Sequence, residues 1–130
     1  MPIRRVLIID DEEDFRAVVA ELLEGEGYEV DVAADGRSAL DKLDDKPPPD
    51  MVLVDLVMPG VSGREVVARL RADARWAGIR VVVMTALPRA DDVSPEVNAV
   101  LLKPFDVEQL MEALRVADDS RFSAACEGCW

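Results

Sequence analysis

Short, continuous apolar runs recur along this chain and alternate with segments of helical spacing. Each run is rich in Val, Leu and Ile, which is typical of strands buried on both faces of a sheet. Four runs have this character: Val6-Leu7-Ile8-Ile9, Met51-Val52-Leu53-Val54, Val81-Val82-Val83-Met84 and Val100-Leu101-Leu102. A fifth, Tyr28 to Ala33, alternates apolar and polar residues as an outer strand does. The pattern predicts an α/β fold with a doubly wound, five-stranded parallel sheet.

The segments between the predicted strands carry apolar residues at helical spacing, so helices are expected on both faces of the sheet. Helical patterns cover Glu12 to Glu24 and Gly36 to Leu43, a third follows Ser62, and the last follows Asp106. Ser62 is the predicted N-cap of the third helix, with Glu65 completing a capping-box pattern. Asp106 is the predicted cap of the last helix.

The chain is strongly acidic, and this limits its partners. It has 130 residues, enough for one domain, and its 15 basic and 27 acidic side chains give a net charge of −12. Nucleic acids and anionic membranes are polyanions, so direct binding to either is not expected. The chain opens without a signal-peptide pattern and its apolar runs are too short to span a bilayer, which predicts a cytoplasmic location.

Residues 119–130 are expected to form a flexible tail after a domain that covers residues 1–118. The tail holds a Cys-x-x-Cys pair, Cys126 and Cys129, a spacing found in zinc and redox sites. The sequence contains neither histidine nor a second cysteine pair to complete a zinc site, so a simple tail is favoured. Trp76 and Trp130 are expected at the surface or in contacts with partners.

Charged and hydroxyl side chains follow the buried strands at the points where these strands end. Asp10 and Asp11 follow the first, Asp55 the third, Thr85 the fourth and Lys103 the fifth. Because parallel strands end at one edge of the sheet, these residues are expected to converge there. Three close carboxylates repel one another unless a cation intervenes, and Mg²⁺ is the usual partner of carboxylate and phosphate oxygens.

The remaining strand-end residues suit the transfer of a phosphoryl group. Lys103 supplies a positive charge and Thr85 a hydroxyl donor for phosphoryl oxygens. A carboxylate can attack phosphorus and form an acyl phosphate, and Asp55 is the most central of the three. Other interpretations stay open: acids are common at a helix N-terminus, Asp55 could be a turn residue, and Lys103 could be a solvated surface lysine.

Four motifs carry a resemblance to a known family: VLIIDDE at 6–12, VLVDLVMPGVSG at 52–63, VVVMTA at 81–86 and LLKPF at 101–105. In this order and spacing they resemble the receiver domain of bacterial two-component response regulators, the CheY-like superfamily, over residues 3 to about 117. The resemblance implies a flavodoxin-like, CheY-like fold. It also implies a cis peptide bond between Lys103 and Pro104.

The resemblance implies a role for each matching position. Mg²⁺ would be held by Asp11 directly, by Asp10 largely through water, by Asp55 and by the backbone carbonyl of Val57. Asp55 would be the phosphoacceptor, with Lys103 pairing and Thr85 hydrogen-bonding to the phosphoryl oxygens. The donor would be a sensor histidine kinase or a phosphotransfer protein, and the domain would catalyse only its own phosphorylation and dephosphorylation. A monomer or weak homodimer is expected.

The chain departs from the family pattern in its output region. Val100 stands where the family usually has a switching Tyr or Phe. The stretch between Thr85 and Lys103 is short and contains Pro88 and Pro95, so the fourth helix is expected to be short or irregular. These features predict an atypical output and leave a phosphorylation-independent interaction module as the alternative.

Val57 and Leu87 flank the expected path of attacking water. The family often has polar side chains there, and two apolar ones cannot orient water by hydrogen bonding. A long-lived phosphoryl-aspartate is therefore predicted.

Overall fold

The computed structural model describes residues 5–45, 47–56, 58, 60–86 and 97–119. These described residues form five strands and four helices in the order β1 (Arg5–Ile9), α1 (Glu13–Gly25), β2 (Glu29–Ala33), α2 (Gly36–Asp45), β3 (Met51–Asp55), α3 (Gly63–Ala72), β4 (Arg80–Thr85), β5 (Ala99–Leu102) and α4 (Val107–Asp119). The helix labelled α4 is the one predicted after Asp106. The predicted short fourth helix falls largely within residues 87–96, outside the described residues.

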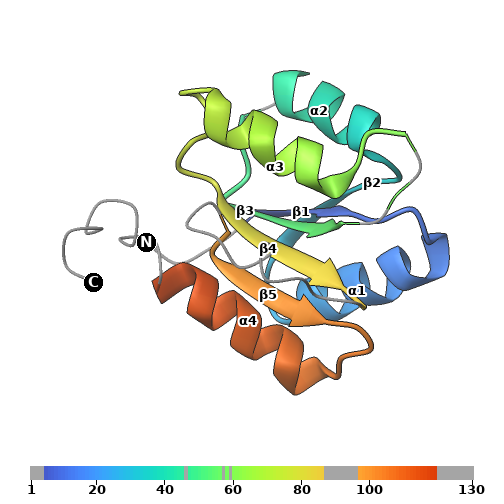
Figure 1. Cartoon of the computed structure of the whole chain (residues 1–130). Helices are drawn as coiled ribbons and strands as arrows, with labels where there is room; N and C mark the ends of the chain where they lie inside the picture. Colours follow the sequence, from blue (N-terminus) through green and yellow to red (C-terminus); the bar gives the residue numbers. More distant parts are fainter. Residues whose placement is uncertain (1–4, 46, 57, 59, 87–96, 120–130) are drawn as a thin grey trace.

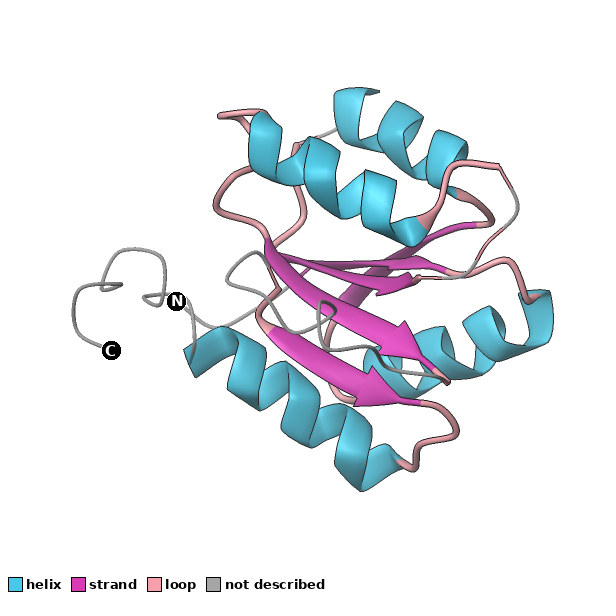
Figure 2. Cartoon of the chain, viewed as in Figure 1, coloured by secondary structure: helices cyan, strands magenta, loops and turns pink. Residues whose placement is uncertain are grey.

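All strand pairs are parallel, and the strand order is β2-β1-β3-β4-β5. Helices α2 and α3 cover one face of the sheet, while α1 and α4 cover the other (Figures 1 and 2). The structure thus confirms the predicted doubly wound five-stranded sheet and the outer position of β2. Among the described helices, none combines the length and hydrophobicity that a bilayer crossing requires.

Successive residues of the central strands point into two separate cores, because side chains alternate across a strand. On β1, Leu7 and Ile9 pack toward α2 and α3, whereas Val6 and Ile8 pack toward α1 and α4. Every residue of β3 is buried. Burying a large aliphatic side chain stabilises the fold by about 1.5–3 kcal/mol, so this strand holds both layers on the sheet.

Trp76 contradicts its predicted surface position. It follows α3, is only 6% exposed and belongs to the core under α2 and α3. Its backbone N–H donates to the Asp73 carbonyl and its carbonyl accepts from Ile79 N–H, so a compact turn carries the ring inward. The Arg75 guanidinium lies 4.5 Å from the ring centroid.

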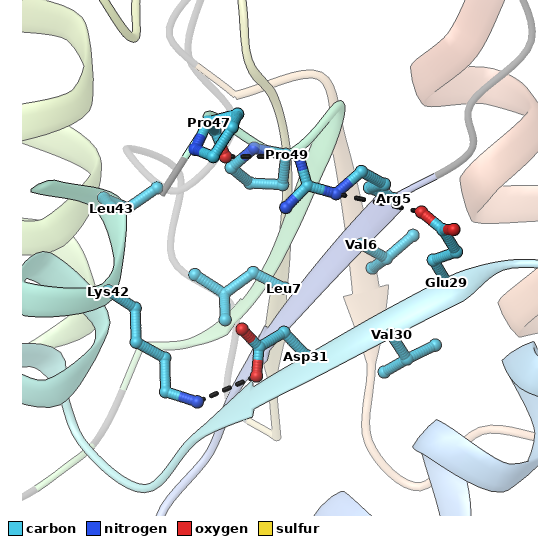
Figure 3. A pocket seen from close by; sticks show the side chains of 10 residues that line it. All are labelled: Arg5, Val6, Leu7, Glu29, Val30, Asp31, Lys42, Leu43, Pro47 and Pro49. Atoms are coloured by element: carbon cyan, nitrogen blue, oxygen red, sulfur yellow. Dashed lines mark hydrogen bonds and ion pairs between the residues drawn. The ribbon is translucent and has the colours of Figure 1, made fainter. Parts of the chain in front are cut away.

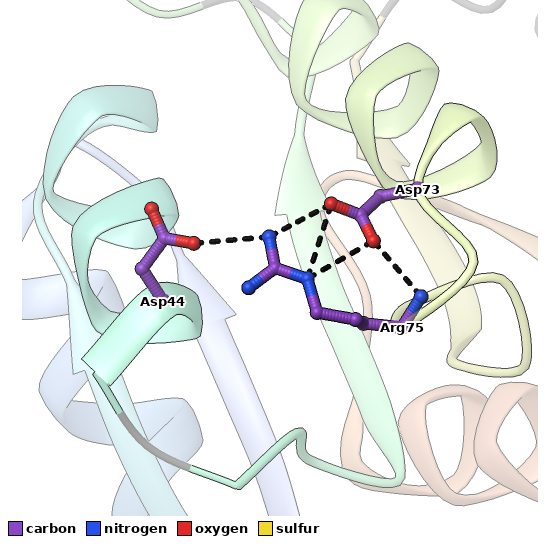
Figure 4. A network of polar contacts seen from close by, with 3 residues as sticks. All are labelled: Asp44, Asp73 and Arg75. Atoms are coloured by element: carbon purple, nitrogen blue, oxygen red, sulfur yellow. Dashed lines mark hydrogen bonds and ion pairs between the residues drawn. The ribbon is translucent and has the colours of Figure 1, made fainter.

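Arg75 also links this turn to α2, as Figure 4 shows. It donates to Asp73 at 2.8 Å and to Asp44 at 3.2 Å. Hydrogen bonds from Arg75 hold the pKa of Asp73 below its ordinary value. The side chains of Arg75 and Asp44 are more than half exposed and that of Asp73 is 30% exposed, so solvent screens these ion pairs and they add little to the stability of the fold.

Side-chain caps begin two helices as predicted. Ser62 Oγ accepts the backbone N–H of Glu65 at 3.3 Å at the start of α3. Before α4, Asp106 Oδ1 accepts the N–H of Gln109 at 2.8 Å, and Gln109 Oε1 accepts the N–H of Asp106 at 2.9 Å. This reciprocal pair is a capping box, which satisfies N–H groups that have no partner inside the helix.

Candidate functional site

Three carboxylates from two strand ends meet at the C-terminal edge of the sheet, the edge toward which the arrows point in Figure 1. Asp10 and Asp11 directly follow β1, and Asp55 is the last residue of β3. One oxygen from each lies within 4.8 Å of the others. Asp10 is 0% exposed and Asp55 7%, while Asp11 is exposed. Such close, partly desolvated acids favour a cation between them.

The backbone around Asp10 fixes the direction of its carboxylate. Its N–H donates to the Ala33 carbonyl at 3.2 Å, and its carbonyl accepts Arg16 Nη1 at 2.7 Å. Its Oδ1 accepts the N–H of Glu12 at 2.9 Å. The second oxygen, Oδ2, faces the ammonium group of Lys103. Arg16 was not predicted from the sequence as a site residue, because its role depends on a contact with backbone.

Lys103 bridges two of the carboxylates. Its Nζ lies 2.8 Å from Asp10 Oδ2 and 3.2 Å from Asp55 Oδ2. Burial lowers the pKa of Lys103, but the hydrogen bond and charge of Asp10, together with Asp55, outweigh burial and raise it above its ordinary value. The group therefore stays a cation at neutral pH. The predicted cis bond between Lys103 and Pro104 is confirmed.

Thr85 lies next to this cluster at the end of β4 and is buried. Its carbonyl accepts the backbone N–H of Lys103 at 2.9 Å, and its strand neighbour on β5 is Leu102. The structure therefore brings Thr85 and Lys103 to the same edge as the acids. Ala86 follows Thr85 and is exposed, and its small side chain occupies little volume at this point. Val57 lies outside the described residues.

Gly63 is required where α3 begins beside Asp55. A Cβ atom at this position would lie 2.1 Å from the Asp55 carbonyl oxygen, far inside contact distance. The Gly63 N–H donates to the Leu56 carbonyl at 3.2 Å, which ties the start of the helix to the end of β3. The position of Gly63 directly after the capping Ser62 was the available clue to its place at the helix start.

Apart from the acidic cluster, a cavity of about 330 Å³ lies in the N-terminal half of the sheet between β1, β2 and α2 (Figure 3). Its charged side chains are already matched. Lys42 Nζ lies 2.8 Å from Asp31 Oδ1, and Arg5 Nε lies 3.9 Å from Glu29. Arg5 also donates to the Pro47 carbonyl at 3.3 Å. These local pairs give the cavity no evident catalytic group, so the acidic cluster is the better candidate site.

The family of the chain is shown by comparison with known protein families. Residues 6–115 match the family model described as the response regulator receiver domain. The chain belongs to this family. As a receiver domain, it is a component of two-component signal transduction.

The match covers different shares of the length of two curated relatives. Sporulation initiation phosphotransferase F of Bacillus subtilis is 36% identical over 115 residues, which cover 85% of this chain and 90% of that protein. The DNA-binding dual master transcriptional regulator RpaA of Synechocystis is 38% identical over 115 residues, again 85% of this chain but 47% of that protein.

Solved receiver structures share the fold. The Thermotoga maritima response regulator TrrA, in complex with Mg(2+)-BeF, is 32% identical with a TM-score of 0.79, covering 88% of this chain and 99% of that chain. Chemotaxis response regulator CheY4 of Vibrio cholerae is 30% identical with a TM-score of 0.80, covering 88% and 98%. These matches support the flavodoxin-like, CheY-like fold predicted from the sequence.

Proposed function

We propose that this receiver domain is a phosphoacceptor switch, in which Asp55 takes a phosphoryl group in a Mg²⁺-dependent reaction. The observation that carries the proposal is the meeting of three carboxylates within 4.8 Å, with Lys103 bridging two of them. The donor would be a sensor histidine kinase or a phosphotransfer protein. The domain would catalyse only its own phosphorylation and dephosphorylation.

The donor set suits a magnesium ion. Asp10, Asp11 and Asp55 offer hard oxygen ligands, and the backbone carbonyl of Val57 is proposed as a further ligand. When bound, Mg²⁺ would supply positive charge that offsets both the carboxylates and the incoming phosphoryl oxygens. The similarity to TrrA, solved with Mg(2+)-BeF, supports this assignment.

Each protein group would then have a distinct role in the transfer. An Asp55 carboxylate oxygen would attack phosphorus and form a new P–O bond. The bond between phosphorus and the donor would break, and its electron pair would leave with the donor. Lys103, already a cation, would pair with a phosphoryl oxygen. Thr85 would donate its hydroxyl hydrogen to another. Such fixed donors stabilise charge that develops in the transition state.

The output is proposed to be atypical. Val100, on β5, is only partly buried and takes the place of the aromatic residue that the family usually has. A phosphorylation-independent protein-interaction module is the second candidate function, and Val100 is the observation that favours it. The downstream target would be a protein, with neither direct nucleic-acid binding nor membrane binding.

Intact mass measurement after incubation with acetyl phosphate and Mg²⁺ tests the acceptor assignment. The wild-type chain is expected to gain one phosphoryl group, and Asp55→Asn none. Absence of uptake from both acetyl phosphate and a cognate kinase would favour the interaction module instead.

The lifetime of the phosphorylated form is a separate expectation. Val57 and Leu87 both lie outside the described residues, and their apolar side chains should hinder the orientation of attacking water. Decay of the phosphoryl group in the presence of Mg²⁺ should therefore be slow. A half-life of seconds would contradict this expectation.

We also propose that the receiver unit covers residues 1–118 and acts in the cytoplasm as a monomer or weak homodimer, with residues 119–130 as a tail. The family match to residue 115 and the end of α4 at Asp119 support this boundary. Cys126 and Cys129 lie outside the described residues. Analytical ultracentrifugation with and without acetyl phosphate would test the oligomeric state.

A further inference from the structure

An aromatic ring lies against the ammonium group of the site lysine. The Lys103 Nζ is 4.3 Å from the ring centroid of Phe15, in the first turns of α1. The ring also meets Phe105 edge to face, with centroids 5.5 Å apart and planes at 79°. Neither aromatic residue belongs to the acid–lysine cluster, yet Phe15 contacts its ammonium group and Phe105 contacts Phe15.

Lysine needs such enclosure more than arginine would. Its ammonium is a point charge on a flexible stem, so it can occupy many positions at little cost. Asp10 and Asp55 attract it with their charge, while the negative face of the Phe15 ring attracts it through the ring quadrupole. Contact with two acids and a ring restricts the stem to few rotamers.

We infer that Phe15 is a positioning residue for Lys103, holding the ammonium group where it meets the phosphoryl group, with Phe105 bracing the ring. The inference rests on the proposed function, because it assigns Phe15 an effect on the same reaction. Phe15 does not touch the reacting atoms and acts through the lysine. It also packs at the margin of the core under α1 and α4, so the test must separate positioning from packing.

Proton NMR tests the contact without any reaction. The chain has three lysines, Lys42, Lys46 and Lys103, so the side-chain signals can be assigned by single substitutions. The ring current of Phe15 should shift the Lys103 ε-methylene protons upfield relative to those of Lys42. The shift should disappear in Phe15→Leu and remain in Phe15→Tyr. Absence of an upfield shift in the wild type would overturn the inference.

The rate of phosphorylation by acetyl phosphate tests the consequence. Phe15→Leu should slow the reaction about fivefold, the ratio that corresponds to about 1 kcal/mol of ring–cation attraction. Phe15→Tyr should retain nearly the wild-type rate. Val18→Ala is the matched control, because Val18 lies on the same helix and is 56% exposed. This variant should be phosphorylated at the wild-type rate.

Fluorination of the ring separates electrostatics from shape. Site-specific incorporation of mono-, di- and trifluorophenylalanine at position 15 weakens the ring quadrupole in steps while nearly keeping its size. The rate should fall with each added fluorine. If wild type takes up phosphoryl and the rate is flat across the series, the inference fails and the proposed function stands. If wild type takes up none, the proposed function fails and this inference with it.

Discussion

The two ends of the sheet handle charge in opposite ways. At the C-terminal edge, Asp10, Asp11 and Asp55 crowd together, and Lys103 bridges two of them. Among the described residues of this cluster, negative charge exceeds positive. This excess of negative charge favours the binding of a further cation.

In the N-terminal half of the sheet, most charged and polar side chains are paired with a neighbour. Lys42 pairs with Asp31 at 2.8 Å. Asn98 Oδ1 accepts the buried N–H of Val81 at 2.7 Å and Arg71 Nη2 at 3.1 Å. Arg71 in turn donates to the Ile79 carbonyl at 2.7 Å. These contacts leave no comparable charge imbalance there among the described residues.

This contrast indicates that a ligand is more readily bound at the C-terminal edge than at the N-terminal end. Matched polar groups stabilise the fold and gain little from a ligand. A cluster with surplus negative charge gains from a cation, and with the cation in place it can accept a phosphoryl group. The comparison therefore predicts that substitutions at the two ends will separate activity from stability.

The largest effect is expected from Lys103→Met. Removal of one fixed donor to a developing charge typically slows a reaction by about 10²–10³-fold, so phosphorylation by acetyl phosphate should slow by about this much. Lys42→Met is the matched control at the other end and should leave the rate unchanged. Equal loss of rate in both variants would break the contrast between the two ends.

Magnesium should stabilise the domain through the C-terminal edge alone. A ligand that binds only the folded state at 100 times its Kd adds about 2.7 kcal/mol to the free energy of unfolding. Thermal unfolding with Mg²⁺ and with EDTA measures this gain. The gain should vanish in the double variant Asp10→Asn/Asp11→Asn and persist in Lys42→Met. A gain that survives in the double variant would place the ion elsewhere.

Asn98→Ala should lower stability without affecting phosphorylation. It deprives the buried Val81 N–H of its side-chain acceptor and Arg71 of a partner. Leaving a buried donor unsatisfied costs about 1–3 kcal/mol. Urea unfolding should report this loss, while intact mass should still show uptake of one phosphoryl group.

Lys42→Met should have the smallest effect on stability. Lys42 and Asp31 are each about a third exposed, with side-chain values of 35% and 37%, so solvent screens their attraction. Pairs of this kind contribute about 0.2–1 kcal/mol. A loss well above this range, measured by urea unfolding, would show that the N-terminal pair is more than a surface ion pair.

Much of the site could be predicted from strand ends alone. Asp10, Asp11, Asp55 and Lys103 were expected to converge because parallel strands end at one edge, and the structure brings them together. Their roles in catalysis and metal binding remain predictions. The caps at Ser62 and Asp106 could also be predicted from the sequence, because capping depends on residues three positions apart.

Trp76 shows where sequence reasoning failed. No periodic pattern includes this residue, so the sequence offered no reason to bury it. In the structure, a turn after α3 folds the ring under the helices, and Arg75 covers it. Burial outside regular elements depends on how the chain returns to the sheet, which local spacing does not encode.

The alternation of strands and helices, the caps and the polar strand ends could all be predicted from the sequence, because each depends on local spacing or on parallel topology. The groups around the Lys103 ammonium could be identified only in the folded structure. Lys103 and Asp10 are 93 positions apart, and the ring of Phe15 reaches the same lysine from α1. Such contacts depend on how a helix packs on the sheet and where each side chain points. These are properties of the assembled fold and not of any segment.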